Sequence, residues 1–171
     1  MSNRTKRVLS TIAGGVAIAI VAGGAPARAE VTDAMTGDEI IAALEAAGLA
    51  ASLLEDVDSG APVARVIAGD ILYFVRAMDC AGGACSTLLF FANFNLGRDA
   101  TTDDFGAVNA FNERQVFGRA YVVDGKNEVG VDYVIDLDGG VTRAHVADSI
   151  GKWADVVASF RNHFRASRTG S

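Results

Sequence analysis

Apolar residues recur every three or four positions in three segments of the chain, the spacing that places side chains on one face of an α-helix. These segments are residues 37–47, residues 101–114 and a final stretch that begins after Thr142. In the final stretch the apolar positions follow one another at intervals of 4, 3, 4, 3 and 4 residues: Val146, Ile150, Trp153, Val157, Phe160 and Phe164. Residues after Arg165 are polar, and we expect them to fray.

Capping signals mark the ends of the helices. Thr36 and Glu39 have the spacing of a capping box, and Gly48 supplies a stop for the first helix. Thr101 can cap the second helix, and its first turn is acidic, which suits the positive end of the helix dipole. The side chains expected on the buried face of this second helix are Phe105, Val108 and Phe111.

Segments rich in β-branched and aromatic residues predict the strands. They span residues 51–57, 63–67, 71–78, 87–94, 117–123 and 129–137. Two pairs of these segments have turn-forming residues between them, Gly82-Gly83 in the first and residues 124–127 in the second. Glycine accepts the positive φ of a tight hairpin, so each pair is expected to form one.

The strand at residues 87–94 has apolar side chains on both faces. Leu88 and Phe90 point to one side, whereas Leu89 and Phe91 point to the other. We therefore expect both faces to be covered, by a helix layer on one side and by a partner, a loop or a second helix on the other.

The strand at residues 129–137 alternates more cleanly. Asp132 and Asp136 lie on one face, which we expect to look towards water. The opposite, apolar face consists of Val129, Val131, Tyr133, Ile135 and Leu137.

The first 29 residues follow the three-part pattern of a secretory signal peptide. Three basic residues open the chain, residues 8–24 carry no charge, and Ala27 and Ala29 supply the small residues that a signal peptidase reads. A retained membrane anchor is the alternative, but the apolar run is shorter than the roughly 20 residues that span a bilayer. We expect cleavage before Glu30, a periplasmic or secreted protein, and a single domain over residues 30–171.

Cleavage makes the protein more acidic. Four of the 15 basic residues and none of the 21 acidic residues precede Glu30, so the net charge changes from −6 to −10. A protein with this charge repels nucleic acid and anionic lipid headgroups. We therefore expect no nucleic-acid partner and no membrane association after cleavage.

Cys80 and Cys85 bracket the glycine turn of the first hairpin, and in an exported protein such a pair is most simply a disulfide. A redox-active pair would have two intervening residues at the start of a helix, whereas this pair has four in a turn. A zinc site would need His145 and His163, which lie 18 positions apart in a different segment. The disulfide is the preferred interpretation.

No motif establishes a catalytic or ligand-binding site. Asp132, Asp136 and Asp138 resemble the start of a calcium loop, but Gly140 and Ala147 occupy later ligand positions, so an exposed strand face is favoured. No serine lies in a nucleophile motif, and no glycine pair belongs to a phosphate loop. We expect neither a metal nor an organic cofactor, and an enzyme is the less favoured hypothesis.

Three stretches resemble the YbjN family of bacterial proteins. They are Val108-Asn109-Ala110-Phe111-Asn112 with Arg114, Phe117-Gly118-Arg119-Ala120-Tyr121, and Leu137-Asp138-Gly139-Gly140-Val141-Thr142. The resemblance covers residues 36–164 and implies an α+β fold similar to type III secretion chaperones. In this fold an antiparallel sheet of five or six strands is packed by three helices. The matching motif residues are Asn109, Asn112, Gly118, Arg119, Gly139 and Gly140.

The family is known for candidate sensory or regulatory proteins without an established reaction. We therefore interpret the chain as an exported, non-catalytic binding or adaptor domain, regulatory or chaperone-like, whose partner is a protein, a peptide or a second copy. A periplasmic enzyme of the hydrolase class, with a site assembled from dispersed residues, is the alternative.

Asn112 is expected to have a structural role. On a helical wheel it falls with Phe105 and Val108, and a buried amide needs hydrogen-bond partners. We predict that it binds backbone atoms near Phe117 and Gly118 and ties the second helix to the second hairpin.

Overall fold

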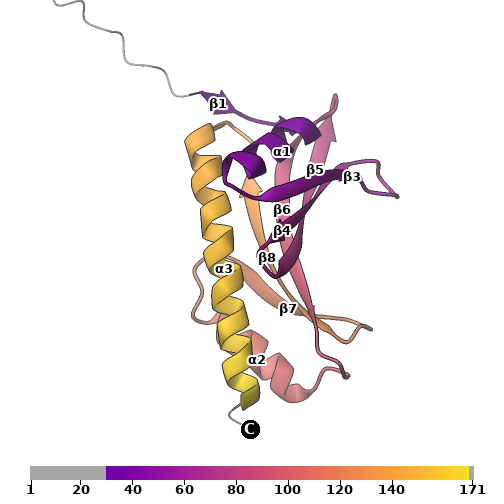
Figure 1. Ribbon diagram of the computed structural model, residues 1–171, viewed down its shortest axis with the longest axis vertical. Coiled ribbons are helices and arrows are strands. Elements are labelled where there is room, and N and C mark those ends of the chain that lie inside the picture. The colour runs from indigo at the N-terminus through magenta and orange to yellow at the C-terminus, as the bar shows by residue number, and fades with distance from the viewer. Residues whose placement is uncertain (1–29, 170–171) are drawn as a thin grey trace, which may run out of the picture.

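The computed structural model describes residues 30–169, and its three helices and nine strands confirm the predicted α+β fold (Figure 1). The helices are α1 (Gly37–Ala46), α2 (Thr102–Asn112) and α3 (Arg143–Thr169). The longer strands are β3 (Ala50–Glu55), β4 (Pro62–Ala68), β5 (Ile71–Ala81), β6 (Ala84–Asn95), β7 (Arg119–Val123) and β8 (Glu128–Asp136). The short strands have two residues each: β1 (Val31–Thr32), β2 (Met35–Thr36) and β9 (Val141–Thr142). The expected signal peptide lies outside the described residues.

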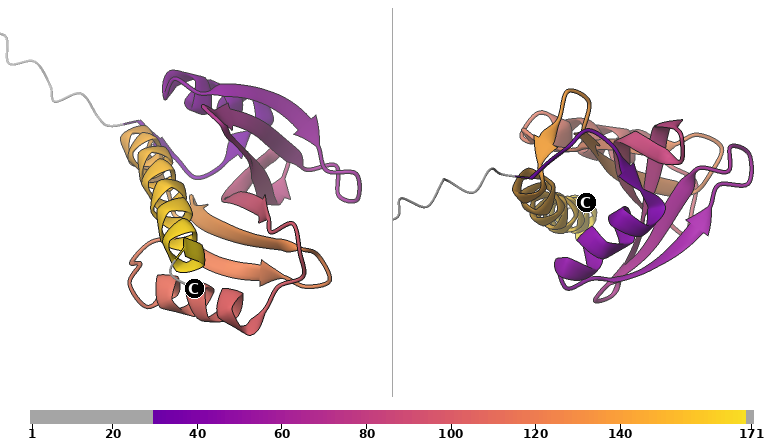
Figure 2. Two further views of the ribbon diagram at one scale, coloured as in Figure 1. Left: turned by 60° about the horizontal axis from the view of Figure 1, so that its bottom comes forward. Right: turned by 90° about the horizontal axis from the view of Figure 1, so that it is seen from above.

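One antiparallel sheet dominates the structure. Its strands follow the order β3-β4-β5-β6-β8-β7, and β2 adds two residues beside the start of β6. A separate ribbon of β1 and β9 joins the beginning of the described chain to the start of α3. The sheet curves around α3, so that its two halves lie on either side of this helix (Figure 2). We call the face that packs against α1 and α3 the inner face, and the opposite face the outer face.

The predicted capping box forms at the start of α1. The Glu39 N–H donates to Thr36 Oγ1 at 3.3 Å, and the Thr36 N–H donates to Glu39 Oε2 at 2.9 Å. Gly48 follows the helix with a φ of +79°, a conformation that favours glycine. The first helix therefore begins and ends within one residue of its predicted bounds.

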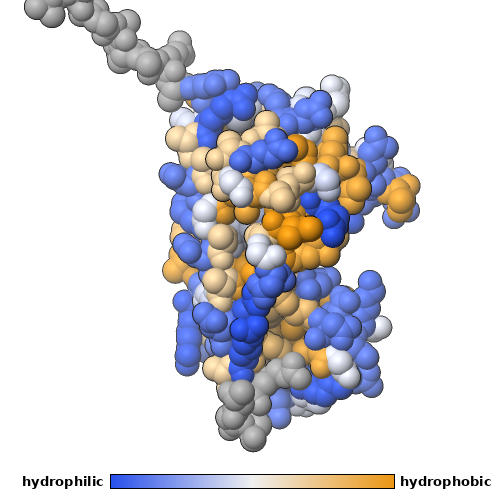
Figure 3. Space-filling model, in the orientation of Figure 1, coloured by the Kyte–Doolittle hydropathy of each residue, from blue (hydrophilic) through white to orange (hydrophobic). Residues whose placement is uncertain are grey.

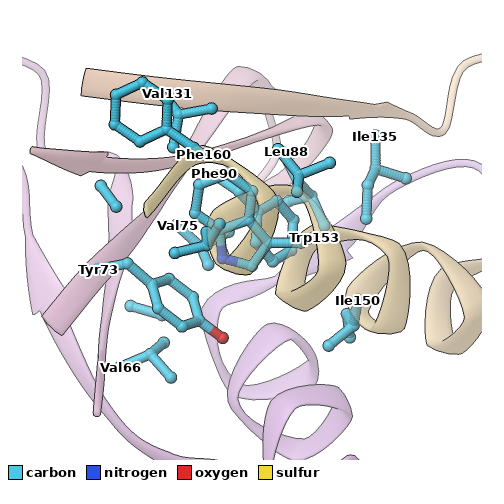
Figure 4. Close-up of a cluster of buried hydrophobic side chains, with 14 of the residues drawn as sticks. Val66, Tyr73, Val75, Leu88, Phe90, Val131, Ile135, Ile150, Trp153 and Phe160 are labelled. Atoms are coloured by element: carbon cyan, nitrogen blue, oxygen red, sulfur yellow. The ribbon is translucent and has the colours of Figure 1, made fainter. Parts of the chain in front are cut away.

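The apolar stripe of α3 forms the centre of the core, and all six of its predicted residues are buried. Trp153 lies against Tyr73 and Phe90, with ring centroids 5.5 and 6.0 Å apart (Figure 4). Burial raises the pKa of Tyr73 to about 12, so its hydroxyl group stays neutral. The helix continues to Thr169, past the residue after which we expect fraying, and Phe164 in its last turns is buried.

The buried face of α2 differs from the prediction. Phe105 is 52% exposed, whereas Asp104 is buried. The cause is a contact from outside the helix: Arg98 Nη2 donates to Asp104 Oδ1 at 3.0 Å, and the Thr101 N–H donates to Asp104 Oδ2 at 2.8 Å. These bonds hold the carboxylate inward and turn the neighbouring phenylalanine towards solvent.

Candidate functional site

Side chains on the outer face line up in rows, because the paired strands place them opposite one another. In one row Phe74 of β5 faces Phe91 of β6, and Phe91 faces Asp132 of β8. In the next row Arg76 faces Leu89, and Leu89 faces Val134.

The centre of the outer face is apolar. The rings of Phe74 and Phe91 stack with their centroids 5.6 Å apart. Large apolar side chains around this pair remain between 39% and 50% exposed: Leu54, Ile67, Leu72, Met78 and Val134. The prediction that both faces of β6 are apolar is confirmed. Within residues 30–169 α1 and α3 pack against the inner face and α2 packs along the β7 edge, so no described helix covers the outer face.

Hydrophobic side chains also reach the molecular surface where β3, β4 and β5 lie (Figure 3). An exposed apolar surface of this kind is unusual on a soluble protein and commonly marks a binding site.

Two arginines lie among the apolar side chains of the outer face, Arg65 beside Phe74 and Arg76 beside Leu89. Arg76 Nη2 lies 3.0 Å from Asp56 Oδ2. Hydrogen bonds from the backbone and side chain of Ser59 hold the pKa of Asp56 below its usual value, so this carboxylate stays ionised. Arg65 faces Phe74 from β4 and forms no ion pair within the described part of the chain. The outer face therefore combines an apolar centre with at least one arginine that can receive a partner's carboxylate.

Asp132 does not face water as predicted, because it is only 7% exposed. Arg119 lies directly opposite on β7 and its Nη2 donates to Asp132 Oδ2 at 2.6 Å. The neighbouring strand therefore covers and neutralises this carboxylate, and Asp136 remains exposed as expected.

Three of the motif residues meet where α2, β7 and α3 come together. Asn112 donates from Nδ2 to the Ala120 carbonyl at 3.1 Å and accepts the Ala120 N–H on Oδ1 at 2.8 Å. Gly118 has a φ of +79°, and a Cβ at this position would lie 2.5 Å from Val156 of α3. Arg119 follows with its bond to Asp132.

Asn112 thus ties α2 to the second hairpin, but not in the predicted way. Its side chain belongs to the exposed side of the helix, whereas the wheel placed it in the apolar face. Its partner is Ala120 and not the backbone near Phe117 and Gly118, because the backbone groups of Ala120 point away from β8 and towards the end of α2.

The remaining motif residues lie elsewhere. Asn109 is exposed on α2 and its side chain has no hydrogen bond within the described residues. Gly139 and Gly140 form the turn before β9 with φ values of +80° and +90°, and a Cβ at Gly140 would lie 2.8 Å from Val31. The motif residues therefore support two junctions of the fold, one near the middle of α3 and one at its start.

Cys80 and Cys85 lie opposite one another in the β5–β6 hairpin, with their sulfur atoms 2.11 Å apart. Gly82 and Gly83 between them both have positive φ, as the turn requires. This hairpin and the β3–β4 loop border an open hollow of about 790 Å³ that includes Asp56.

The other candidate residues do not assemble into a catalytic or metal site. His145 is exposed, and a ring nitrogen of His163 lies 2.8 Å from the Ala107 carbonyl. Asp136 and Asp138 accept hydrogen bonds from the turn that follows β8. No group of three or more metal-ligating side chains occurs among residues 30–169. Nor does any helix in that range combine the length and hydrophobicity needed to cross a membrane.

Sequence reasoning did not identify the Arg98–Asp104 pair, the lack of an ion pair for Arg65 within residues 30–169, or the exposed edge of the sheet at β3. The first two depend on how side chains are oriented in the folded chain, which spacing along the sequence does not specify. The edge had a sequence signal, since residues 46–54 carry no charge.

Comparison with known proteins agrees with the architecture. Residues 36–166 match the sequence model of the YbjN family, described as "putative bacterial sensory transduction regulator". The crystal structure of YbjN from E. coli, described as a putative transcription regulator, superposes with a TM-score of 0.55 at 15% identity. The match covers 78% of this chain and 92% of that one. No curated protein matches the chain.

Proposed function

Because the chain belongs to the YbjN family, we infer that it is an exported, non-catalytic binding or adaptor domain that holds a protein partner on its outer face. The family is described as regulatory, which fits a domain that acts by binding. A regulatory or chaperone-like role requires a surface for another protein, and the outer face offers one.

The observation that carries this proposal is the apolar centre of the outer face, which no described helix covers. Fully burying a Val, Leu or Phe side chain is worth about 1.5 to 3 kcal/mol. The side chains around Phe74 and Phe91 are about half exposed, so a partner that covers several of them gains part of that energy at each. Arg65 adds a positive charge that favours a carboxylate next to the partner's apolar residues.

Two observations support export. Glu30, the first residue after the expected cleavage site, is held at the start of α3: its carboxylate lies 2.8 Å from Arg143 Nε, and its carbonyl accepts the Arg143 N–H. The cysteine pair at disulfide distance also suits an oxidising compartment.

Crosslinking from periplasmic extract, followed by quantitative mass spectrometry, tests the proposal. Val134→Asp places a charge on the outer face at a side chain that is 50% exposed, and we expect it to lose a partner that the wild-type protein captures in stoichiometric amount. Val116→Asp is the matched control, since Val116 is 86% exposed and lies before β7, outside the rows of the outer face. Equal capture by both variants, with melting temperatures unchanged, would contradict binding at the outer face.

A further inference from the structure

The two edges of the main sheet differ in whether their backbone groups are satisfied. At the β7 edge, the outward N–H and C=O of Ala120 are both bound by the Asn112 side chain. Helix α2 also packs along this strand. Asn112 thus occupies part of the place that another strand would take, and together with α2 it obstructs this edge at Ala120.

The β3 edge is open. Asp56 directly follows β3, and its N–H donates to the Ala61 carbonyl at 2.9 Å. Every second residue back from Asp56 therefore also directs its backbone N–H and C=O towards β4, namely Leu54 and Ser52. Because bonding alternates along an antiparallel strand, Ala51, Leu53 and Glu55 direct their N–H and C=O groups away from β4. Within residues 30–169 no hydrogen bond takes up these outward groups.

Only Glu55, at the end of β3, gives this edge a charge. Natural sheets commonly guard their edges with charged residues, prolines or bulges. Residues 50–54 contain no charge and no proline, and they pair with β4 without a bulge. An edge of this kind is a template for an additional strand.

The surrounding charge indicates what kind of strand fits. Residues 30–64 contain eight acidic residues and no basic one, although Arg65 of β4 follows directly and lies across from Ser52. Arg143 pairs with Glu30 and Glu39, and Arg76 pairs with Asp56. Five carboxylates form no ion pair within the described residues: Asp33, Asp38, Glu45, Glu55 and Asp58. Residues 30–64 include β3 and the helix α1 that packs against it. A second copy would bring the same carboxylates to the edge and be repelled, whereas a segment with basic flanks would be attracted.

We propose that the β3 edge binds an extended segment of a partner protein by strand addition, and that this segment carries Lys or Arg on either side of alternating apolar residues. The proposal rests on the binding function inferred above and names how the partner docks. The added strand would bond to Ala51, Leu53 and Glu55. One set of its side chains would lie beside Leu54 and extend the apolar outer face, because Leu54 belongs to the same row as Arg76 and Leu89.

The test uses the mature protein and a fluorescein-labelled synthetic peptide of alternating valine and threonine flanked by two lysines at each end. Fluorescence anisotropy should show saturable binding that weakens as NaCl rises from about 20 mM to about 300 mM, because salt screens the attraction. A peptide with glutamates in place of the lysines should not bind. Failure of the lysine peptide to bind at low salt would overturn the proposal.

Ala51→Pro removes one outward N–H and breaks no bond of the β3–β4 ladder. Ala51→Val is its matched control, since it keeps the N–H and adds similar bulk. We expect about a tenfold or greater loss of peptide affinity for the proline variant and little change for the valine variant. Hydrogen exchange should show that the peptide slows exchange at Leu53 and Glu55. Equal affinities, or protection at other strands, would refute strand addition.

Two further results separate this proposal from the binding function. If Val134→Asp loses the captured partner while Ala51→Pro keeps it, the outer face is the binding site and strand addition is wrong. If the protein alone sediments as a dimer that Ala51→Pro dissociates, the occupant is a second copy, and the basic partner segment is refuted.

Discussion

Replacing Asn112 with alanine removes the two hydrogen bonds that join α2 to Ala120 at the β7 edge. Ala120 is buried, and its N–H and C=O would lose the partners that Asn112 supplies. An unpaired buried backbone group costs about 1 to 3 kcal/mol. Alanine has a higher helix propensity than asparagine by about 0.5 kcal/mol, but Asn112 is the last residue of α2, where this gain is small.

We therefore expect Asn112→Ala to lower the free energy of unfolding by about 1 to 3 kcal/mol in urea titrations followed by circular dichroism. Asn109→Ala is the matched control on the same helix, because that side chain is exposed and has no hydrogen bond within the described residues. It should change the free energy of unfolding by no more than about 0.5 kcal/mol. Partner affinity of the folded Asn112→Ala protein should stay near the wild-type value.

Two results would refute this reasoning. If the two alanine variants have the same stability, the Ala120 backbone does not depend on the Asn112 amide. If Asn112→Ala keeps wild-type stability and loses its partner, Asn112 belongs to the binding surface and not to the fold.

Two further predictions concern Asp104 and the cysteine pair. Hydrogen bonds from Arg98 and Thr101 depress the pKa of Asp104 in the folded protein. The ionised carboxylate therefore stabilises the folded state fully at pH values above its pKa in the unfolded chain, which is about 4, and this stabilisation is lost as the pH falls below that value. Asp104→Asn should therefore lower the free energy of unfolding by about 1 to 3 kcal/mol at pH 7. A plot of this free energy against pH should also fall less steeply at acid pH for the variant than for the wild-type protein. Parallel curves for the two proteins would contradict this prediction. For the exported protein, intact mass should begin at Glu30 and be two hydrogens below the reduced mass, and reduction should cost about 2 kcal/mol of stability. Quantitative thiol labelling under denaturing conditions without reductant would show instead that Cys80 and Cys85 are free.

Local patterns predicted the elements that depend on neighbouring residues. The capping box at Thr36, the glycine turn at Gly82 and the stripe of α3 are all readable from spacing within a few positions. The two-residue strands β1, β2 and β9 are too short to produce a pattern, and they form because other segments bring them into register.

The errors in side-chain exposure have a common physical cause. Asp132 is buried because Arg119 lies across from it, and Phe105 is exposed because Arg98 draws the adjacent carboxylate inward. In both cases a charged side chain outside the strand or helix concerned changes which residues are buried, so the exposure differs from the one that the spacing of apolar residues predicts. The outer face illustrates the same limit: Leu89 and Phe91 predicted its apolar character, but its lack of cover depends on where the helices pack.

The family motif and the candidate binding surfaces occupy different parts of the structure. Asn112, Gly118 and Arg119 support one edge of the sheet, and Gly139 with Gly140 positions the start of α3. None of these residues lies on β3 or among the apolar residues at the centre of the outer face. These residues therefore account for one edge of the sheet and for the start of α3. Our proposals place partner choice in residues outside this set, so two proteins that share these residues can share the fold and bind different segments.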